Sequence, residues 1–204
     1  MNKKLFAIIA FFCFTALSFI ACSDDDEVEI DQEWVALNDK QVTDVAANSD
    51  FTAIKSYSEN GSVYYRKIDF LEETPTPTQK SSLTPKISPD GKPYFTDSIA
   101  IRYEGRFYLK DGTPHIFDST EGENGNARIY RTRVNKFIDG FSTMLQQMKL
   151  SDGMDEVEVC IPYKLGYNAT AQYSNNVMTI PAYTTLWFKI KLIAIYPDNP
   201  GEFD

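Results

Sequence analysis

The chain has 204 residues, with 29 acidic and 20 basic side chains and a formal net charge of −9. This length suits one domain with an extension. The acidic balance argues against nucleic-acid binding, which needs a basic surface, so we expect no nucleic-acid partner.

The first 22 residues have the pattern of an export signal. Lys3 and Lys4 supply positive charge, an uncharged run extends from Leu5 to Ala21, and Cys22 follows. Residues 19–22 resemble a bacterial lipobox, with Cys22 as the lipidated first residue of the mature chain. The alternatives are a plain signal peptide and an uncleaved anchor helix, although 17 residues are at the short limit for a membrane span. We therefore expect residues 1–21 to be removed and acyl chains on Cys22 to anchor the protein to a membrane.

An acidic segment, Ser23-Asp24-Asp25-Asp26-Glu27, follows the predicted lipidation site. It is at least a solvated tether, and we assign residues 22–30 to the lipidated cysteine and this tether. It also resembles the acidic signal that sends some Gram-negative lipoproteins to the cell surface. Cleavage would remove Lys3 and Lys4 but no acid, so the net charge would change from −9 to −11. The predicted location is the outer membrane of the cell envelope, with surface display as a further expectation.

The segment after the tether is less regular. Residues 31–61 are assigned to an N-terminal helical extension, because a broken apolar face is formed by Trp34, Leu37 and Val45. Residues 63–70 are rich in aromatic and β-branched side chains and predict a strand. The Thr-Pro-Thr-Pro segment at 74–77 predicts a loop, because proline cannot donate to a β-ladder.

The second half of the chain alternates strands with one strongly apolar helix. Residues 98–108 alternate apolar and charged side chains, which predicts a half-buried strand, and residues 128–134 predict another. A helix is predicted over residues 136–149, with Asn135 as its N-cap and one apolar face: Phe137, Ile138, Phe141, Met144, Leu145 and Met148. Two further strands are expected, at 156–161 and 185–195. A single helix packed into the concave face of an antiparallel sheet satisfies this pattern, so the predicted fold class is α+β.

The candidate metal ligands and nucleophiles are few. Cys160 lies in an alternating strand, where a buried inert thiol is expected rather than a nucleophile. His115 is the only histidine and is expected at the surface. Without other histidines or paired cysteines, no zinc ligand set is present in the sequence, so we expect neither a metal nor a cofactor. Four acids that lie close together in the sequence are expected to form a solvated rim: Asp152, Asp155, Glu156 and Glu158.

Four segments in order carry the most specific signal. They read IRYEGRFYLKDGTPHIFDST from residue 101, FIDGFSTMLQQM from 137, CIPYKLGYN from 160 and IPAYTTLWFKIKL from 180. Together they resemble the FK506-binding-protein (FKBP) family of peptidyl-prolyl cis-trans isomerases. The resemblance implies an FKBP-like domain at 62–197, in which a twisted antiparallel sheet wraps around one short amphipathic helix, followed by a tail at 198–204. It also implies an apolar pocket that accepts proline-containing polypeptide segments.

The resemblance assigns roles residue by residue. It implies that six residues act in catalysis: Tyr103, Phe117, Asp118, Ile138, Tyr167 and Phe188. It implies that three more bind the substrate: Phe137, Phe141 and Ile180. The Ile138 backbone N–H is expected to donate to a substrate carbonyl, and the Tyr167 hydroxyl to reach the bound ligand. Aromatic and aliphatic residues suit this reaction, because a dry pocket favours the twisted, less polar transition state over the planar amide.

Departures from the family pattern leave a second interpretation open. Phe141 stands where the family usually has a tryptophan floor, and Lys136 where an acidic or polar residue is common. Residues 169–179 form a long polar segment that is expected as a loop over the pocket. These features favour a catalytically weak or inactive FKBP-like binding module as the alternative to an isomerase that assists the folding of envelope or exported proteins. A nutrient-binding surface lipoprotein is a third possibility, but Trp34 and Trp187 are not grouped into a carbohydrate platform.

Overall fold

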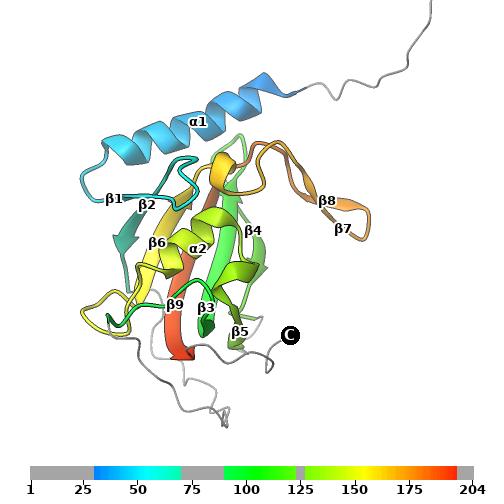
Figure 1. The fold of residues 1–204 in the computed structure, drawn as a ribbon. Coiled ribbons are helices and arrows are strands. Elements are labelled where there is room, and N and C mark those ends of the chain that lie inside the picture. The colour runs from blue at the N-terminus through cyan, green and yellow to red at the C-terminus, as the bar shows by residue number, and fades with distance from the viewer. Residues whose placement is uncertain (1–29, 70–89, 123–126, 197–204) are drawn as a thin grey trace, which may run out of the picture. The chain divides into compact units, whose positions relative to one another are not determined.

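The structure is a computed structural model that describes residues 30–69, 90–122 and 127–196 (Figure 1). The predicted signal segment, Cys22, the acidic tether, the loop at 74–77 and the tail lie outside the described residues. The helices are α1 (Gln32–Ala47) and α2 (Asp139–Leu145), with short 3-10 turns η2 (Val134–Lys136) and η3 (Tyr163–Leu165). The strands are β1 (Thr52–Lys55), β2 (Ser62–Lys67), β3 (Ser98–Tyr108), β4 (Pro114–Ser119), β5 (Tyr130–Arg133), β6 (Glu156–Ile161), β7 (Gln172–Ser174), β8 (Val177–Ile180) and β9 (Leu186–Tyr196).

Seven of these strands form one antiparallel sheet. Its order is β1-β2-β6-β9-β3-β4, and β5 pairs with the first half of β3. The two 11-residue strands β3 and β9 form the central ladder, from Ser98 opposite Tyr196 to Arg106 opposite Trp187. β7 and β8 pair only with each other. The predicted fold class, a twisted antiparallel sheet around one short helix with an N-terminal extension, is confirmed.

The sheet packs one face against α2, as Figure 1 shows. On β9 the alternate residues Leu186, Phe188, Ile190 and Leu192 enter the main core with Phe141, Met144 and Leu145 of the helix. Gly140 allows this close packing, because a Cβ at that position would lie 2.4 Å from Ile161 Cγ2. The helix is thereby held against β6 and β9.

The α2 helix is shorter than predicted and begins later. Its N-cap is Ile138 rather than Asn135, and residues 137 and 138 are extended. The Ser142 hydroxyl donates to the carbonyls of Val134, at 2.8 Å, and Phe137, at 3.3 Å, which ties the preceding segment back onto the helix. This prediction was wrong about the helix start because the apolar periodicity of 137–148 continues through residues that are not helical.

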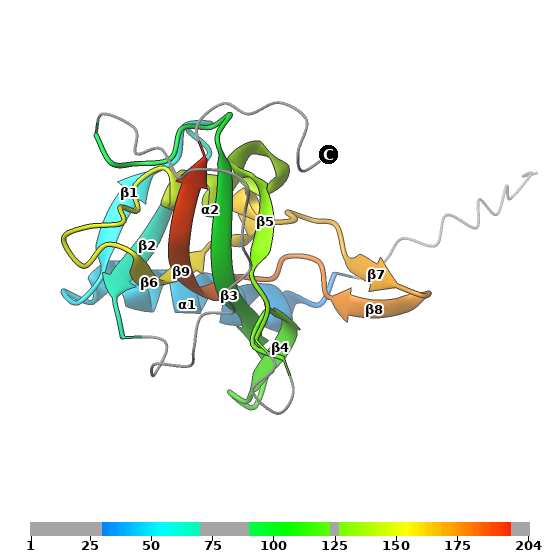
Figure 2. The same ribbon diagram turned by 90° about the horizontal axis from the view of Figure 1, so that it is seen from below.

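The extension is helical over α1 but not throughout. Asp31 caps α1 by accepting a hydrogen bond from the Trp34 N–H at 3.0 Å. The helix lies across one end of the sheet (Figures 1 and 2), where the Trp34 ring meets Phe107 edge-on at 6.0 Å. Residues 52–55 are not helical; they form β1, which pairs with β2. Of the extension, α1 therefore packs on the sheet and β1 is part of it.

The sheet face opposite α2 carries buried charges in its middle. Glu158 of β6 accepts hydrogen bonds from Arg66 and Arg106, and Arg106 also pairs with Glu104 at 3.2 Å. The prediction that Glu158 belongs to a solvated rim was wrong, because its pairing with two arginines allows the carboxylate to be buried. Within residues 30–69, 90–122 and 127–196, no helix is long and apolar enough to cross a membrane.

Candidate functional site

Five aromatic side chains predicted for the site converge between α2 and the sheet. The Phe141 ring is central: it stacks on Phe137, with ring centroids 4.3 Å apart, and meets Phe188 at 4.8 Å and 89°. Tyr103 of β3 lies 6.0 Å from Phe141, and Phe117 of β4 lies 5.6 Å from Phe188. The perpendicular contacts are the arrangement that aromatic quadrupoles favour. Residues far apart in the chain thus form one continuous aromatic cluster.

Gly105 explains how two of these rings approach each other across β3. A Cβ at this position would lie 2.6 Å from Phe188 and 2.8 Å from Phe117. Any side chain here would displace one ring or the other. The β3–β4 register also shifts beside this glycine.

A polar pair borders the aromatic cluster. The Tyr103 hydroxyl donates to Asp118 Oδ2 at 2.5 Å, and an Arg128 guanidinium nitrogen lies 4.0 Å from the other oxygen. Burial, together with the hydrogen bond to the Asp118 carboxylate, raises the pKa of Tyr103 well above its ordinary value. The Tyr103 phenol therefore stays protonated and acts as the donor.

The charge of the same carboxylate also acts on Tyr167. This side chain is half-buried and packs against the main core. Burial, and then the negative charge of Asp118, raises its pKa. Asn168, which follows it, adopts φ of +56°, a conformation that asparagine tolerates better than most residues.

The other two predicted residues contribute backbone and an apolar wall. Ile138 is half-buried and extended, and its carbonyl accepts from the Ser142 N–H at 3.0 Å. Its own N–H has no acceptor among the residues that the structure describes. Ile180, at the end of β8, is buried in the main core.

The segment 169–179 is not the loop that its polarity predicts. Residues 172–180 form the β7–β8 hairpin, which projects away from the main sheet (Figure 2). Asn175 and Asn176 both have positive φ, as a tight two-residue hairpin turn requires. Only the base of the hairpin, at Ile180, joins the main core, and Tyr173 is 65% exposed. Lys136 is also exposed.

Sequence reasoning missed one neighbour of the site. Tyr130 of β5 meets Tyr103 at 6.0 Å and Phe137 at 6.2 Å, edge-on in both cases. The pairing of β5 with β3 brings Tyr130 to the cluster. The sequence feature that could have indicated Tyr130 is the short strand predicted at 128–134, in which it lies.

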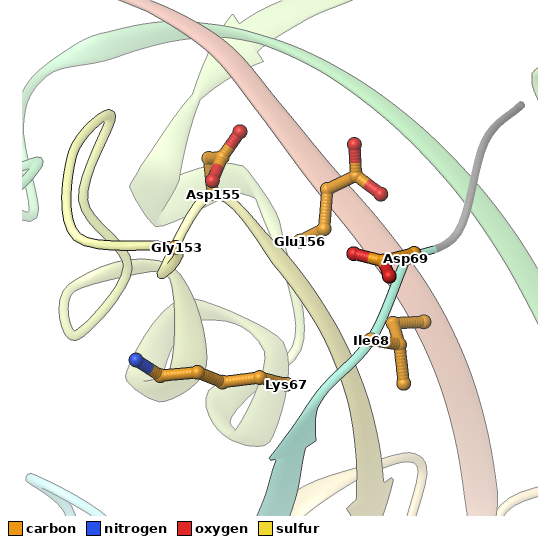
Figure 3. Close-up of a pocket in the computed structure, with 6 residues that line it drawn as sticks. All are labelled: Lys67, Ile68, Asp69, Gly153, Asp155 and Glu156. Carbon is orange, nitrogen blue, oxygen red and sulfur yellow. The ribbon is translucent and has the colours of Figure 1, made fainter. Parts of the chain in front are cut away.

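A hollow of about 470 Å³ lies elsewhere and has a different character (Figure 3). Lys67, Asp155 and Glu156 line it, together with Ile68, Asp69 and Gly153. The Lys67 ammonium donates to the Asp152 carbonyl, and Glu156 pairs with Lys191. This polar hollow contains none of the nine predicted residues, and its charges do not suit a proline ring.

The remaining chemistry-bearing residues do not form a reactive centre. His115 is exposed, as predicted, and Cys160 is fully buried. Burial, and then the charge of Glu158, raises the pKa of the Cys160 thiol. Among the described residues, no group of three or more histidine, cysteine or acidic side chains is arranged to hold a metal ion.

Comparison with known proteins agrees with this architecture. The family model of FKBP-type peptidyl-prolyl cis-trans isomerases matches residues 90–193, a range that includes all nine predicted site residues. The chain therefore belongs to the FKBP-type peptidyl-prolyl cis-trans isomerase family. A search of the curated proteins gives no match.

Two solved structures show the same fold. A peptidyl-prolyl cis-trans isomerase from Pseudomonas syringae pv. tomato aligns with a TM-score of 0.54 and 21% identity, over 81% of this chain and 95% of that one. FkpA from Escherichia coli aligns with a TM-score of 0.53 and 18% identity, over 81% of this chain. This alignment covers only 61% of FkpA.

Proposed function

We propose that the protein catalyses cis–trans isomerisation of X-Pro bonds in the space bordered by the aromatic cluster and the Tyr103–Asp118 pair. The observation that carries the proposal is the convergence of Tyr103, Phe117, Phe137, Phe141 and Phe188 between α2 and the sheet. The family match over residues 90–193 supports the same reading.

The chemistry needs no nucleophile or metal. Resonance holds the X-Pro bond planar behind a barrier of roughly 18–20 kcal/mol. An apolar surround disfavours the charge-separated planar amide more than the twisted transition state, which lowers that barrier. In this proposal the Ile138 N–H donates to a substrate carbonyl. The hydrogen bond from the Tyr103 hydroxyl to the Asp118 carboxylate fixes the side of the pocket that these two residues form.

The test is an isomerisation assay on the chain from Ser23 onward with a short X-Pro-Phe peptide and FK506 as competitor. Tyr103→Phe and Phe117→Ala are expected to lower the rate, and FK506 to block it. Tyr173→Ala, which removes a ring that is 65% exposed on the β7–β8 hairpin, is the matched control and should retain the wild-type rate. A folded, monodisperse protein without any acceleration refutes the enzyme proposal.

The alternative is a binding module that grips a polypeptide without turning it. Phe141 in place of the usual tryptophan favours it, because a smaller ring leaves a less complete floor. The discriminating result is saturable binding of an X-Pro peptide, lost in Phe117→Ala, in a sample that shows no isomerisation.

We further propose that the protein is a lipoprotein of the cell envelope that assists the folding of exported proteins. The support is the basic start, the uncharged run to Ala21, and the lipobox-like segment that ends at Cys22. Uncatalysed proline isomerisation takes tens of seconds, so a catalyst near newly exported chains would speed their folding.

Cys22→Ala should abolish incorporation of labelled palmitate and move the protein out of the membrane fraction. Retention of label in that variant contradicts the assignment of Cys22.

A further inference from the structure

Phe137 belongs both to the aromatic cluster and to a neighbouring groove of about 580 Å³. Three aromatic residues line this groove: Tyr57, from the turn between β1 and β2, Phe95, from the segment before β3, and Phe137 itself. The rest of the lining is polar and comes from Ser58 and from residues in and beside α2, namely Asp139, Ser142, Thr143 and Gln146. We call it the Tyr57–Phe95 groove. Its volume lies within the range of about 300–1,000 Å³ that is usual for ligand sites.

The two outer rings of the groove are exposed to a degree unusual for aromatic side chains. Tyr57 is 67% exposed and Phe95 is 52% exposed. Neighbouring exposed apolar groups on a folded domain mark a surface that another apolar group covers.

The walls of the groove are held in place by hydrogen bonds to α2 and the residues after it. Ser58, next to Tyr57, donates to the Asp139 carboxylate, and the Tyr57 hydroxyl accepts from the Gln147 side chain at 3.4 Å. Lys92, which precedes Phe95 in the same segment, donates to the same Gln147 side chain at 2.7 Å. The groove is therefore formed before any ligand arrives, which reduces the entropy lost on binding.

The polar side chains that line the groove have hydrogen-bond partners within the protein. Asp139 accepts from Ser58, and the Ser142 hydroxyl donates to the Val134 carbonyl. The Thr143 hydroxyl donates to Asp139 at 3.4 Å, and the Gln146 amide donates to the Ser142 carbonyl at 3.1 Å. With these groups engaged, the groove offers mainly carbon surface. A side chain that fits it is aromatic or large and aliphatic, because such a group loses nothing by leaving water.

We propose that the Tyr57–Phe95 groove binds an apolar side chain of the same polypeptide whose X-Pro bond occupies the candidate site. This inference rests on the proposed function. The link is Phe137, whose ring lines the groove and stacks on Phe141 at 4.3 Å. A chain seated in the site can thus continue into the groove. The substrate class is then an extended, apolar, proline-containing segment, as unfolded polypeptides expose.

The test compares kcat/KM for a four-residue X-Pro peptide with that for twelve-residue peptides in which one Phe is scanned along an alanine background. With the best-placed Phe, the long peptide should be turned over about tenfold more efficiently than its all-alanine parent. The double variant Tyr57→Ala/Phe95→Ala should bring that ratio close to one. Tyr94→Ala removes the adjacent ring, which is 48% exposed and lines no part of the groove, and should keep the wild-type ratio.

The outcomes separate the two proposals. Absence of isomerisation on every peptide refutes the proposed function itself. Isomerisation with a ratio near one in the wild type, or a high ratio that persists in the double variant, refutes the groove alone.

A photoreactive benzophenone at the best Phe position should crosslink to residues 57, 95 or 143, and crosslinking confined to the β7–β8 hairpin overturns the proposal. Self-association in sedimentation that the double variant abolishes assigns the groove to a second copy and also overturns it.

Discussion

The Tyr103 hydroxyl is a sensitive probe of the candidate site, because it is the polar end of an otherwise aromatic contact. Tyr103→Phe keeps the ring contacts with Phe141 and Phe188 and removes the hydrogen bond to Asp118. We expect the isomerisation rate to fall several-fold. The free energy of unfolding should fall by only about 1 kcal/mol, because Asp118 is half-exposed and regains water.

Stopped-flow isomerisation and urea unfolding measure these two effects separately. Asp118→Asn is the matched control, since the amide oxygen can still accept from the Tyr103 hydroxyl, and it should have the smaller effect on rate. An unchanged rate in Tyr103→Phe contradicts a role for the hydroxyl.

Cys160 gives a prediction about pH. The folded protein holds the thiol pKa above its ordinary value of 9.0, chiefly by burial. Above about pH 9 the unfolded chain therefore loses the thiol proton while the folded chain keeps it. The unfolded state binds fewer protons there, so stability present below pH 9 is lost as the pH rises. Urea unfolding of wild type and Cys160→Ala between pH 7 and about pH 10 should show the steeper decline in the wild type.

Thiol labelling provides an independent measurement on the same residue. In the chain from Ser23 onward Cys160 is the only cysteine. It should react with an aromatic disulfide reagent after unfolding but not in the native state at pH 8. Rapid labelling of the native protein contradicts the burial of Cys160.

Among the elements, α1 depends on Asn38 for its attachment. This side chain is fully buried; it accepts from the Thr185 N–H at 2.7 Å and donates to the Trp34 carbonyl at 2.9 Å. Asn38→Ala leaves the buried Thr185 N–H without its acceptor, so we expect a loss of about 2–3 kcal/mol in unfolding free energy. Asp39→Ala, at the exposed neighbouring position, should stay within about 0.5 kcal/mol of wild type. Equal stability of the two variants would contradict the proposed contribution of the Asn38 hydrogen bonds to the attachment of α1.

The elements that the sequence predicts well are those with one apolar face. β3, β6 and β9 lie within a residue of their predicted ranges, because apolar and polar residues alternate along their sequences. The prediction that residues 98–108 are half-buried was wrong, because paired charges such as Arg106 are buried on the second face of β3. β1 was not predicted: three of its four residues are exposed, so pairing with β2 rather than burial defines it. β7 and β8 also lack a buried face over most of their length. The adjacent residues Asn175 and Asn176, which form the turn, were the sequence feature that could have predicted this hairpin.

For the candidate site, the resemblance rather than periodicity supplied the residues. Periodicity places Phe141 and Phe188 in the core but cannot distinguish a core ring from a pocket ring. The contribution of Tyr57 and Phe95 could not be predicted, because it depends on two loops that meet only after β1, β2 and β3 have paired around α2. Side chains on such loops carry no periodic signal.

At the scale of the whole molecule, the charged face of the sheet determines how β2, β3 and β6 stay aligned. Glu158 of β6 is 4% exposed and accepts from Arg66 on the neighbouring strand β2 and from Arg106 on β3, which lies beyond β9 in the sheet. Glu158→Gln keeps the shape of the side chain but leaves Arg106 with Glu104 alone. We expect a loss of about 3 kcal/mol in unfolding free energy, at the lower end for a broken buried pair, because that second partner remains.

Urea unfolding measures this loss, and an exposed ion pair provides the control. Glu59→Gln removes the partner of Lys55, whose side chain is 67% exposed, and should cost less than about 0.5 kcal/mol. High salt should reduce the small effect of Glu59→Gln further and leave that of Glu158→Gln nearly unchanged, because buried charges are poorly screened. If salt removes both effects alike, Glu158 is reached by solvent and the alignment of the strands rests on backbone pairing and the core instead.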